Sequence, residues 1–345
     1  MNSLNREMII DGKVIGRQQP VYIIAEMSTN HGGSLTRAKE IIHAAAECGA
    51  DAIKLQTYTA DTLTLNSSLP HFQLTDGLWA GQSLYELYEK VAMPWEWHQP
   101  LLEEAQKANI TLFSSPFDRS AVEFLEQLDV PAYKIASAEI IEVELIEAVA
   151  ATGKPVIIST GGAAIGDIQR AINIMKAHDN PNLCLLKCTS AYPAPYDSMN
   201  LTTIAHLAQW SGCPVGLSDH SLGISVPVTA VALGACVIEK HFMLDKSHDT
   251  ADQAFSLDPS EFAQMVQSVR QAAMAIGQVD YPSTTRMQRA IYAKCDMPAG
   301  TILSRENIRT ARPGGTIAPR HFNDLLGRVL RQNIKAGECL RWEMI

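Results

Sequence analysis

Two histidines, each placed after a short apolar run, are the residues whose types and spacing first suggest chemistry. His220 follows Val215–Leu217 in the segment GLSDH, and His241 follows Cys236–Ile238 in the segment CVIEKH. An Ala- and Val-rich stretch with helical spacing lies between the two runs, so we predict a strand–helix–strand unit. Parallel strands end on the same side of a sheet, where two imidazoles can share a divalent metal and leave positions open for substrate. Two hydrogen-bonded rim histidines without a metal are the alternative interpretation.

Lysine occurs inside two otherwise apolar runs, where a charge is costly. Lys54 lies in AIKLQT and Lys134 lies in AYKIA, so each must face a polar cavity or a partner. Hydroxyl side chains occur at several neighbouring strand ends: Ser115, Ser137, Ser159 and Ser218. A ring of ammonium and hydroxyl donors suits a ligand that carries phosphate and carboxylate. The alternative is that the lysines pair with glutamates such as Glu26 or Glu139.

Apolar runs of strand length alternate with amphipathic stretches over most of the chain. The runs are Val21–Met27, Ala52–Thr57, Ile110–Ser114, Ala132–Ala136, Val156–Ser159, Leu183–Cys188, Val215–Leu217 and Cys236–Ile238. The predicted helices include Ser34–Cys48, Trp95–Ala108, Ser120–Leu128, Val143–Ala151, Ile168–Lys176 and Pro259–Ile276. Eight strands that alternate with helices over about 250 residues predict an α/β fold, the (β/α)8 TIM barrel. A doubly wound open sheet is the alternative, but no Gly-rich dinucleotide turn follows the first strand.

The alternation of strands and helices does not extend to the two ends of the chain. Residues Met8–Arg17 predict a hairpin with Asp11-Gly12 as its turn, placed to close the bottom of the barrel. We therefore predict a catalytic barrel over residues 1–277, a linker over 278–289, and a small β-rich domain over 290–345. The last domain has short β-like runs (AIYAKC, TILS, GRVLRQNI and ECLRWEMI) and needs support from the barrel or from a partner subunit.

One connection is longer than a barrel requires. Residues Tyr58–Pro94 separate the second strand from the next long helix. A long insertion on this face of a barrel is usually a lid or a specificity element. Its aromatic side chains are Phe72, Trp79, Tyr85 and Tyr88, and each could instead pack the loop onto the barrel.

The amino-acid composition and the net charge limit the classes of binding partner that we expect. The 345 residues are 46% hydrophobic and 19% charged, as in ordinary globular proteins, and the net charge of −9 argues against a nucleic-acid or membrane-surface partner. The seven cysteines are odd in number and mostly lie in apolar contexts, which indicates reduced thiols. The sequence shows no signal peptide and no apolar run of membrane-spanning length, so we expect a cytoplasmic location.

A family resemblance rests on ordered motifs along nearly the whole chain. IIAEMSTNHGGS, DAIKLQTY, FSSPFD, YKIAS, IISTGG, KCTSAYPAP, GLSDHS and VIEKHF occur in the order found in the sialic acid synthase family, the phosphoenolpyruvate-condensing nonulosonate synthases. The tail, with MPAG, LSRENI and RPG, resembles their C-terminal antifreeze-like (SAF) domain. The insertion LPHFQLTDGLWAGQSLYELY, with MPWEWH and DQAFSLDP, most resembles the branch that makes pseudaminic acid.

The resemblance implies a role for each matched residue. His220 and His241 would bind a divalent metal, usually Mn²⁺, with Mg²⁺ or Co²⁺ as alternatives. Phosphoenolpyruvate would be surrounded by Lys54, Lys134, Ser115, Ser137, Ser159 and Ser218. The sugar or the metal-bound water would face Glu26, Gln56, Tyr192 and Asp252, with Glu26 as the candidate general acid or base. Arg312 would reach the active site of the other subunit in a domain-swapped homodimer.

The implied reaction joins phosphoenolpyruvate to the aldehyde of an open-chain acetamido sugar. C3 of phosphoenolpyruvate attacks the aldehyde polarised by the metal, water adds at C2, and phosphate leaves by C–O cleavage. The expected sugar is 2,4-diacetamido-2,4,6-trideoxy-altrose. Ser190 stands where neuraminate synthases usually have Asn, and the insertion around Trp79 does not match theirs, so N-acetylneuraminate and legionaminate synthases remain alternatives for the sugar. Ser115 also stands where Thr is common in the family. A non-catalytic sugar-binding barrel is the alternative from a different class.

Overall fold

The computed structural model describes residues 3–77, 79–281 and 287–345. The chain divides into two units, Met1–Gly277 and Gln278–Ile345. Residues 282–286 of the predicted linker lie outside the described residues.

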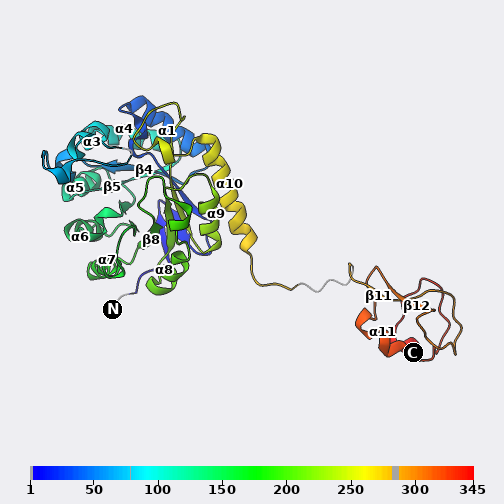
Figure 1. The fold of residues 1–345 in the computed structure, drawn as a ribbon. Helices are drawn as coiled ribbons and strands as arrows, with labels where there is room; N and C mark the ends of the chain where they lie inside the picture. Colours follow the sequence, from blue (N-terminus) through cyan, green and yellow to red (C-terminus); the bar gives the residue numbers. More distant parts are fainter. Residues whose placement is uncertain (1–2, 78, 282–286) are drawn as a thin grey trace. The chain divides into compact units, whose positions relative to one another are not determined.

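The first unit is built on a closed parallel barrel (Figure 1). Its strands follow the order β10-β3-β4-β5-β6-β7-β8-β9 around the barrel. Their bounds are β3 (Tyr22–Glu26), β4 (Ala52–Thr57), β5 (Thr111–Pro116), β6 (Tyr133–Ile135), β7 (Val156–Ser159), β8 (Leu183–Cys188), β9 (Val215–Asp219) and β10 (Val237–His241). Strand β10 pairs with β3 from Val237↔Tyr22 to His241↔Glu26, which closes the sheet. The predicted TIM barrel is confirmed and the open sheet is excluded.

Helices surround the barrel (Figure 1). They are α1 (Leu35–Glu47), α2 (Ala60–Leu63), α3 (Leu84–Val91), α4 (His98–Lys107), α5 (Arg119–Gln127), α6 (Val143–Ala151), α7 (Ile165–Ala177), α8 (Thr203–Ser211), α9 (Ser225–Ala232) and α10 (Pro259–Ile276). The predicted helix at Trp95 begins as a 3-10 turn, η3 (Trp95–Trp97), and α4 starts at His98. Helix α10 opens with a capping box between Asp258 and Glu261, which satisfies free N–H groups of its first turn. No helix among the described residues has the length and apolarity that crossing a membrane requires.

The barrel interior changes from apolar to polar along each strand. The hairpin β1 (Glu7–Ile10) and β2 (Lys13–Gly16) supplies Met8, Ile10 and Ile15 to a buried cluster with residues near the strand starts. That cluster also contains Tyr22, Ile24, Ala52, Phe113, Ala132, Ile157, Cys184, Leu186, Cys236 and Val237. Since side chains alternate along a strand, the next inward positions after Ile24, Ala52 and Ile157 are Glu26, Lys54 and Ser159. The hairpin therefore closes one end of the barrel, and the polar residues gather at the other.

Gly216 shows how tightly the interior of the barrel is packed. A Cβ at this position would lie 2.3 Å from the Val237 carbonyl oxygen and 2.8 Å from Cδ2 of Leu186. Only glycine lets strands β8, β9 and β10 approach this closely just below Ser218.

Strands β9 and β10 continue beyond the ends that the apolar runs predict. The sequence places these ends at Leu217 and Ile238, but pairing continues through Glu239↔Ser218 and Lys240↔Asp219. Polar residues stay in the strands because the closed barrel buries and pairs them. Hydrophobicity alone could not locate these ends.

The second unit is small and mostly irregular. It holds β11 (Ala290–Ala293) paired with β12 (Ile308–Ala311), α11 (Phe322–Leu325), and 3-10 turns η7 (Pro319–His321) and η8 (Trp342–Met344). The other predicted β-like runs form only isolated bridges, such as Ile302↔Val329 and Met297↔Ile334. Its core is Ile291, Ala293, Met297, Leu303, Ile308, Ile317, Leu325, Leu330, Ile334, Leu340, Met344 and Ile345.

Candidate active site

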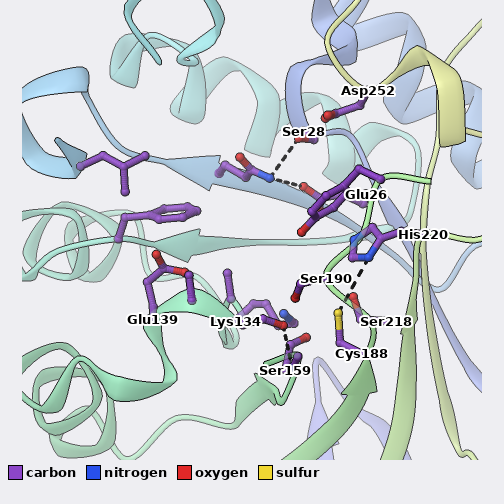
Figure 2. A pocket seen from close by; sticks show the side chains of 18 of the residues that line it. Glu26, Ser28, Lys134, Glu139, Ser159, Cys188, Ser190, Ser218, His220 and Asp252 are labelled. Atoms are coloured by element: carbon purple, nitrogen blue, oxygen red, sulfur yellow. Dashed lines mark hydrogen bonds between the residues drawn. The ribbon is translucent and has the colours of Figure 1, made fainter. Parts of the chain in front are cut away.

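One cavity of about 750 Å³ lies at the carboxyl ends of the barrel strands. The last inward side chain of each strand points toward this mouth because the strands run parallel. Residues predicted from the sequence make up much of its lining: Glu26, Lys54, Gln56, Lys134, Ser137, Ser159, Tyr192, Ser218, His220, His241 and Asp252. Figure 2 shows Glu26, Lys134, Ser159 and Ser218 converging from four different strands, with His220 just after the strand that carries Ser218.

Ser115 and Arg312 are the predicted residues that this lining does not include. Ser115 is fully buried next to Lys54, whose ammonium donates a hydrogen bond to the Ser115 hydroxyl at 3.2 Å. The structure thus places Ser115 behind the lysine instead of at the cavity surface. Arg312 belongs to the second unit, so its predicted place at the site stays a prediction.

Two lysines and two glutamates form a buried charged group at the base of the cavity, which we call the strand-end cluster: Glu26, Lys54, Lys134 and Glu239. The Lys54 ammonium lies 2.5 Å from Oε2 of Glu26 and 3.9 Å from Oε2 of Glu239. The Lys134 ammonium lies 3.8 Å from Oε1 of Glu239, which also accepts a hydrogen bond from Ser218 at 2.8 Å. Each side chain is at most 6% exposed. The cluster contains equal numbers of acidic and basic groups, so ammonium and hydroxyl donors do not form the ring alone. Lys54 pairs with Glu26, as the alternative interpretation predicts.

Burial and neighbouring charges shift the pKa values of these groups in opposite directions. Burial raises the pKa of Glu26, although Lys54 partly offsets the effect. Burial alone would also raise the pKa of Glu239, but Lys134 and Lys54 outweigh it and lower the pKa to about 2. Burial lowers the pKa of Lys134. Glu239 therefore stays ionised near neutral pH, whereas Glu26 and Lys134 are shifted toward the range in which they exchange protons.

Hydroxyl groups line the side of the cavity next to Lys134. The Ser159 hydroxyl is buried and lacks a hydrogen-bond partner, and the Ser137 hydroxyl accepts from the Gly161 N–H at 3.1 Å. A Cβ at Gly161 would lie 2.3 Å from the Ser190 hydroxyl and 2.8 Å from that of Ser137. Glycine at this position leaves the hydroxyls accessible to one another and to a ligand.

The two histidines lie together on the opposite side of the cavity. Their ring centroids are 5.3 Å apart, and Nδ1 of His220 faces the Thr189 carbonyl oxygen at 3.2 Å. Burial, together with the neighbouring His241, lowers the pKa of His220 to about 3. The neutral His220 ring therefore donates from Nδ1 and keeps a free lone pair on Nε2. Figure 2 also shows its contact with the Cys188 thiol.

The chemistry of the histidine pair fits a divalent metal. A metal requires neutral imidazoles, and Nδ1 of His241 is buried without a hydrogen-bond partner. Asp252 Oδ2 lies 3.5 Å from that nitrogen, and His241 lowers the pKa of Asp252 to about 2 against the effect of burial. A carboxylate beside a ligating histidine is a common arrangement in metal sites. Within 3–77, 79–281 and 287–345, no group of three or more His, Cys, Asp or Glu side chains is placed to hold a metal ion.

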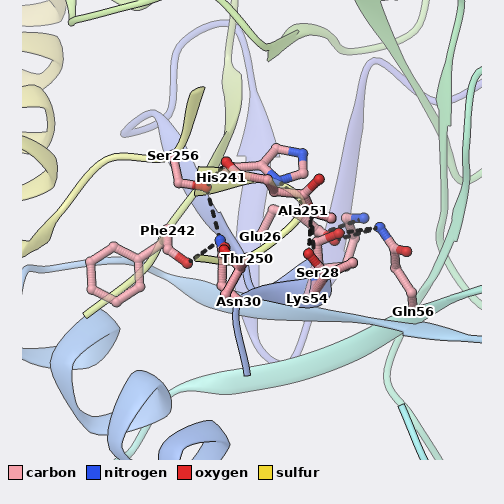
Figure 3. A network of polar contacts seen from close by, with 12 residues as sticks. Glu26, Ser28, Asn30, Lys54, Gln56, His241, Phe242, Thr250, Ala251 and Ser256 are labelled. Carbon is pink, nitrogen blue, oxygen red and sulfur yellow. Dashed lines mark hydrogen bonds and ion pairs between the residues drawn. The ribbon is translucent and has the colours of Figure 1, made fainter. Parts of the chain in front are cut away.

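A polar network fixes the loop that carries Asp252 (Figure 3). Asn30 donates to the Phe242 carbonyl at 3.0 Å and to the Ser256 hydroxyl at 2.8 Å, and it accepts from Thr250 at 2.6 Å. These bonds join the first βα loop to the loop after β10, the strand that pairs with β3. Asp252 itself accepts from Thr29 at 3.2 Å. The carboxylate is therefore held in place beside His241.

The insertion supplies the outer part of the cavity. Its lining side chains, which we call the insertion wall, are apolar or aromatic: Tyr58, Leu63, Leu74, Trp79, Leu84, Leu87, Tyr88 and Val91. Trp79 donates from Nε1 to the Ala251 carbonyl at 3.3 Å, which joins the insertion to the loop after β10. Tyr85 instead bonds Asp61 at 3.0 Å, and neither it nor Phe72 lines the cavity. The insertion thus takes part in the site, with two of its four predicted aromatics facing the cavity.

Sequence reasoning missed two acidic residues of the cavity. Glu239 has no role among the sequence-based predictions, although it lies two positions before His241 and so must share its face of β10. Glu139 was considered only as a lysine partner, but its Oε2 atom is buried without a hydrogen-bond partner and burial raises its pKa. Period-two counting back from His241 would have found Glu239. Glu139 lies in a 3-10 turn, η4 (Ala138–Ile141), where no such period applies.

Comparisons with known proteins find a matching family or domain for each of the two units. Residues 41–281 match the NeuB family and residues 288–345 match the SAF domain. The chain is 46% identical over 327 residues to a pseudaminic acid synthase of Campylobacter jejuni, covering 93% of this chain and 95% of that protein. It is 42% identical over 329 residues to a pseudaminic acid synthase of Helicobacter pylori, covering 93% and 97%. A solved N-acetylneuraminic acid synthetase from Leptospira borgpetersenii, in complex with citrate, shares 32% identity with a TM-score of 0.73 over 83% of this chain and 95% of that one.

Proposed function

The chain belongs to the NeuB family, and from this premise we propose that it condenses phosphoenolpyruvate with 2,4-diacetamido-2,4,6-trideoxy-altrose to give pseudaminic acid and phosphate. The observation that carries the proposal is the cavity itself, in which a buried lysine–glutamate cluster faces the pair of histidines. The curated relatives described above, which are synthases of pseudaminic acid, support the choice of sugar.

We assign phosphoenolpyruvate to the side of the cavity that holds Lys134, Ser137 and Ser159. The Lys134 ammonium has its nearest carboxylate at 3.8 Å, and the Ser159 hydroxyl has no partner, so both can accept an anion without breaking a short bond. Phosphate and carboxylate oxygens are the ligands that such donors bind best. Lys54 lies between Glu26 and Glu239, where it would orient the anion and the acid–base group together.

His220 and His241 would hold the divalent metal, for which we propose Mn²⁺, with Mg²⁺ or Co²⁺ as alternatives. When bound, such a metal supplies Lewis-acid polarisation of the sugar aldehyde. The Thr189 carbonyl fixes the tautomer of His220, and Asp252 orients His241. The remaining groups of the site bind, orient and move protons.

The balanced reaction uses one water, which gives its oxygen to the C2 carbonyl, one proton to the new hydroxyl at the former aldehyde carbon, and one proton to the leaving phosphate. A C–C bond forms between C3 of phosphoenolpyruvate and the aldehyde carbon, water adds at C2, and the C2–O bond to phosphate breaks. Glu26 is placed to hold or release the proton, because it accepts from Gln56 at 3.0 Å and its pKa is raised by burial. Glu26 also contacts Lys54, so an anion bound at Lys54 would change the electrostatic environment of the Glu26 carboxylate.

The insertion wall supports a sugar with few exposed hydroxyls. A 6-deoxy sugar with two acetamido groups carries three methyl groups, which can contact Leu74, Leu84 and Tyr88. A C6 hydroxyl, as in N-acetylmannosamine, would lose its water there without a clear partner. Buried lysines are costly to keep in a simple binding protein, which argues against a non-catalytic sugar-binding barrel.

A substrate panel tests the proposal. Phosphate release from phosphoenolpyruvate is measured with Mn²⁺ and each candidate sugar in turn. We expect release with 2,4-diacetamido-2,4,6-trideoxy-altrose and little with N-acetylmannosamine. Release only with N-acetylmannosamine or the legionaminate precursor would reassign the sugar, and no release with any sugar would favour the binding barrel.

We further propose that the enzyme works in the cytoplasm as a domain-swapped homodimer in which Arg312 reaches the partner's cavity. All seven cysteines are free, which supports a reducing compartment. The second unit buries a small core of its own and would gain stability by docking on a partner. Removing residues after Gly277 should abolish most activity, and full activity in the shortened chain would show that the second unit has no catalytic role.

A further inference from the structure

Lys240 and Asp219 form a fully buried ion pair that does not line the cavity. The ammonium lies 2.6 Å from Oδ2 of Asp219, and both side chains are 0% exposed. The two residues are register partners on β10 and β9. They lie on the face of these strands opposite to Glu239 and Ser218 because side chains alternate.

The ion pair holds the residues directly before and directly after His220. Lys240 also donates to the Ser221 carbonyl oxygen, and Oδ1 of Asp219 accepts from the Ser221 N–H at 2.9 Å. Residues 219 and 221, on either side of the histidine, are therefore both bound through one ammonium group. This matters because β9 ends at Asp219, so no strand pairing holds His220. Apart from these bonds, the His220 carbonyl accepts from the Ala194 N–H at 3.0 Å.

The same pair connects the two histidines. Asp219 directly precedes His220, and Lys240 directly precedes His241, the last residue of β10. A bond between residues 219 and 240 therefore fixes the backbone separation from which both imidazoles project. We propose that Lys240 and Asp219 are positioning residues that set the distance and orientation of His220 and His241 for a shared divalent cation. The inference rests on the proposed function, which assigns the metal to these histidines.

Energetics favour positioning over stability as the role of the pair. Replacing a buried ion pair by apolar residues of similar volume is often neutral or stabilising, so a stable barrel does not require the charges. A salt bridge with added hydrogen bonds specifies one geometry, which packing of flexible apolar chains would not. Groups that support metal ligands from behind typically change metal affinity about 10- to 100-fold when they are removed.

Mn²⁺ binding to the full-length chain tests the proposal, measured by isothermal titration calorimetry together with thermal melting. The variants are the double replacement Asp219→Leu/Lys240→Met, which removes both charges, and the isosteric Asp219→Asn. We expect both to stay folded and to bind Mn²⁺ about 10- to 100-fold more weakly than the wild-type chain. Lys154→Met is the control, because it removes 2.9 Å ion pairs to Glu126 and Asp129 at the other end of the barrel and should leave Mn²⁺ affinity unchanged.

Each outcome decides between the proposals. Folded variants with wild-type Mn²⁺ affinity would overturn the positioning role and leave the proposed function intact. A wild-type chain that binds no Mn²⁺, or binds it equally well after His241→Ala, would remove the metal from both proposals. If neither variant folds, the pair is required for folding and the positioning role is overturned.

Discussion

The inner and outer halves of the cavity are built by opposite means. The inner half is the strand-end cluster with its histidines, where charged side chains at most 6% exposed project from barrel strands. The outer half is the insertion wall, where mostly half-buried apolar side chains project from a loop and the short helix α3. The charged groups of the inner half have ion-pair and hydrogen-bond partners in fixed positions. The insertion wall instead offers an apolar surface with few polar groups. We infer that the inner half sets the reaction and the outer half sets which sugar reacts.

His241→Ala should give the largest effect, because it removes half of the metal site. We expect kcat to fall by about 10³-fold or more even with added Mn²⁺, since Lewis-acid polarisation contributes several kcal/mol. Phosphate release and Mn²⁺ binding are the measurements, with exposed His206→Ala as the matched control. A near wild-type rate in His241→Ala would show that the histidine pair does not hold the metal.

Lys54→Ala should come next, because it leaves Glu26 and Glu239 without their shared cation. The two carboxylates would then repel the anionic substrate, and we expect kcat/KM for phosphoenolpyruvate to fall about 10²-fold or more. Lys13→Ala removes a 2.9 Å pair with Asp51 near the N-terminal hairpin and should have no such effect. An unchanged kcat/KM in a folded Lys54→Ala chain would contradict the role of Lys54 at the substrate.

The two halves also differ in how far the sequence predicts them. Lys54 and Lys134 stand out because a charge inside an apolar strand must be satisfied locally, and the barrel then brings them together. How far below the cavity surface a strand residue lies is harder to predict from the sequence. Ser115 is predicted at the cavity, but the structure places it behind Lys54. The positions of wall residues depend on how the insertion packs across the mouth, for which no short period exists. The second unit shows the same difficulty, since of its predicted β-like runs only AIYAKC forms a strand, and the others pair at single bridges.

Leu74→Asn should affect the sugar and spare phosphoenolpyruvate, because it places a polar group in the insertion wall. A lost apolar contact in a pocket changes kcat/KM by about 10- to 100-fold, so we expect such a decrease for the 6-deoxy sugar. The KM for phosphoenolpyruvate should stay near wild type. Leu65→Asn is the control within the same insertion, since Leu65 is 66% exposed and outside the lining. Equal losses for both substrates would mean that the wall supports the fold instead of the sugar.

The smallest effect concerns acid stability at a buried histidine next to the insertion. His98, just beyond the insertion, bonds the Thr57 hydroxyl at 2.8 Å and the Trp95 carbonyl at 3.1 Å, and burial lowers its pKa to about 4. The unfolded chain binds this proton near pH 6.5, so the stabilisation is complete above that pH and falls by about 1.4 kcal/mol per pH unit down to about pH 4. Glu239 and Asp252, with pKa values of about 2, lose their contribution only below the ordinary carboxyl range.

Urea unfolding from pH 7 to pH 4.5 measures this dependence. His98→Gln keeps hydrogen-bonding capacity without the titration, so its stability should fall less steeply with pH than that of the wild-type chain. Exposed His178→Gln controls for the substitution itself. If His98→Gln kept the full wild-type slope, the acid sensitivity would lie elsewhere in the fold. Buried His220, whose pKa is lowered to about 3, would then be the next group to replace.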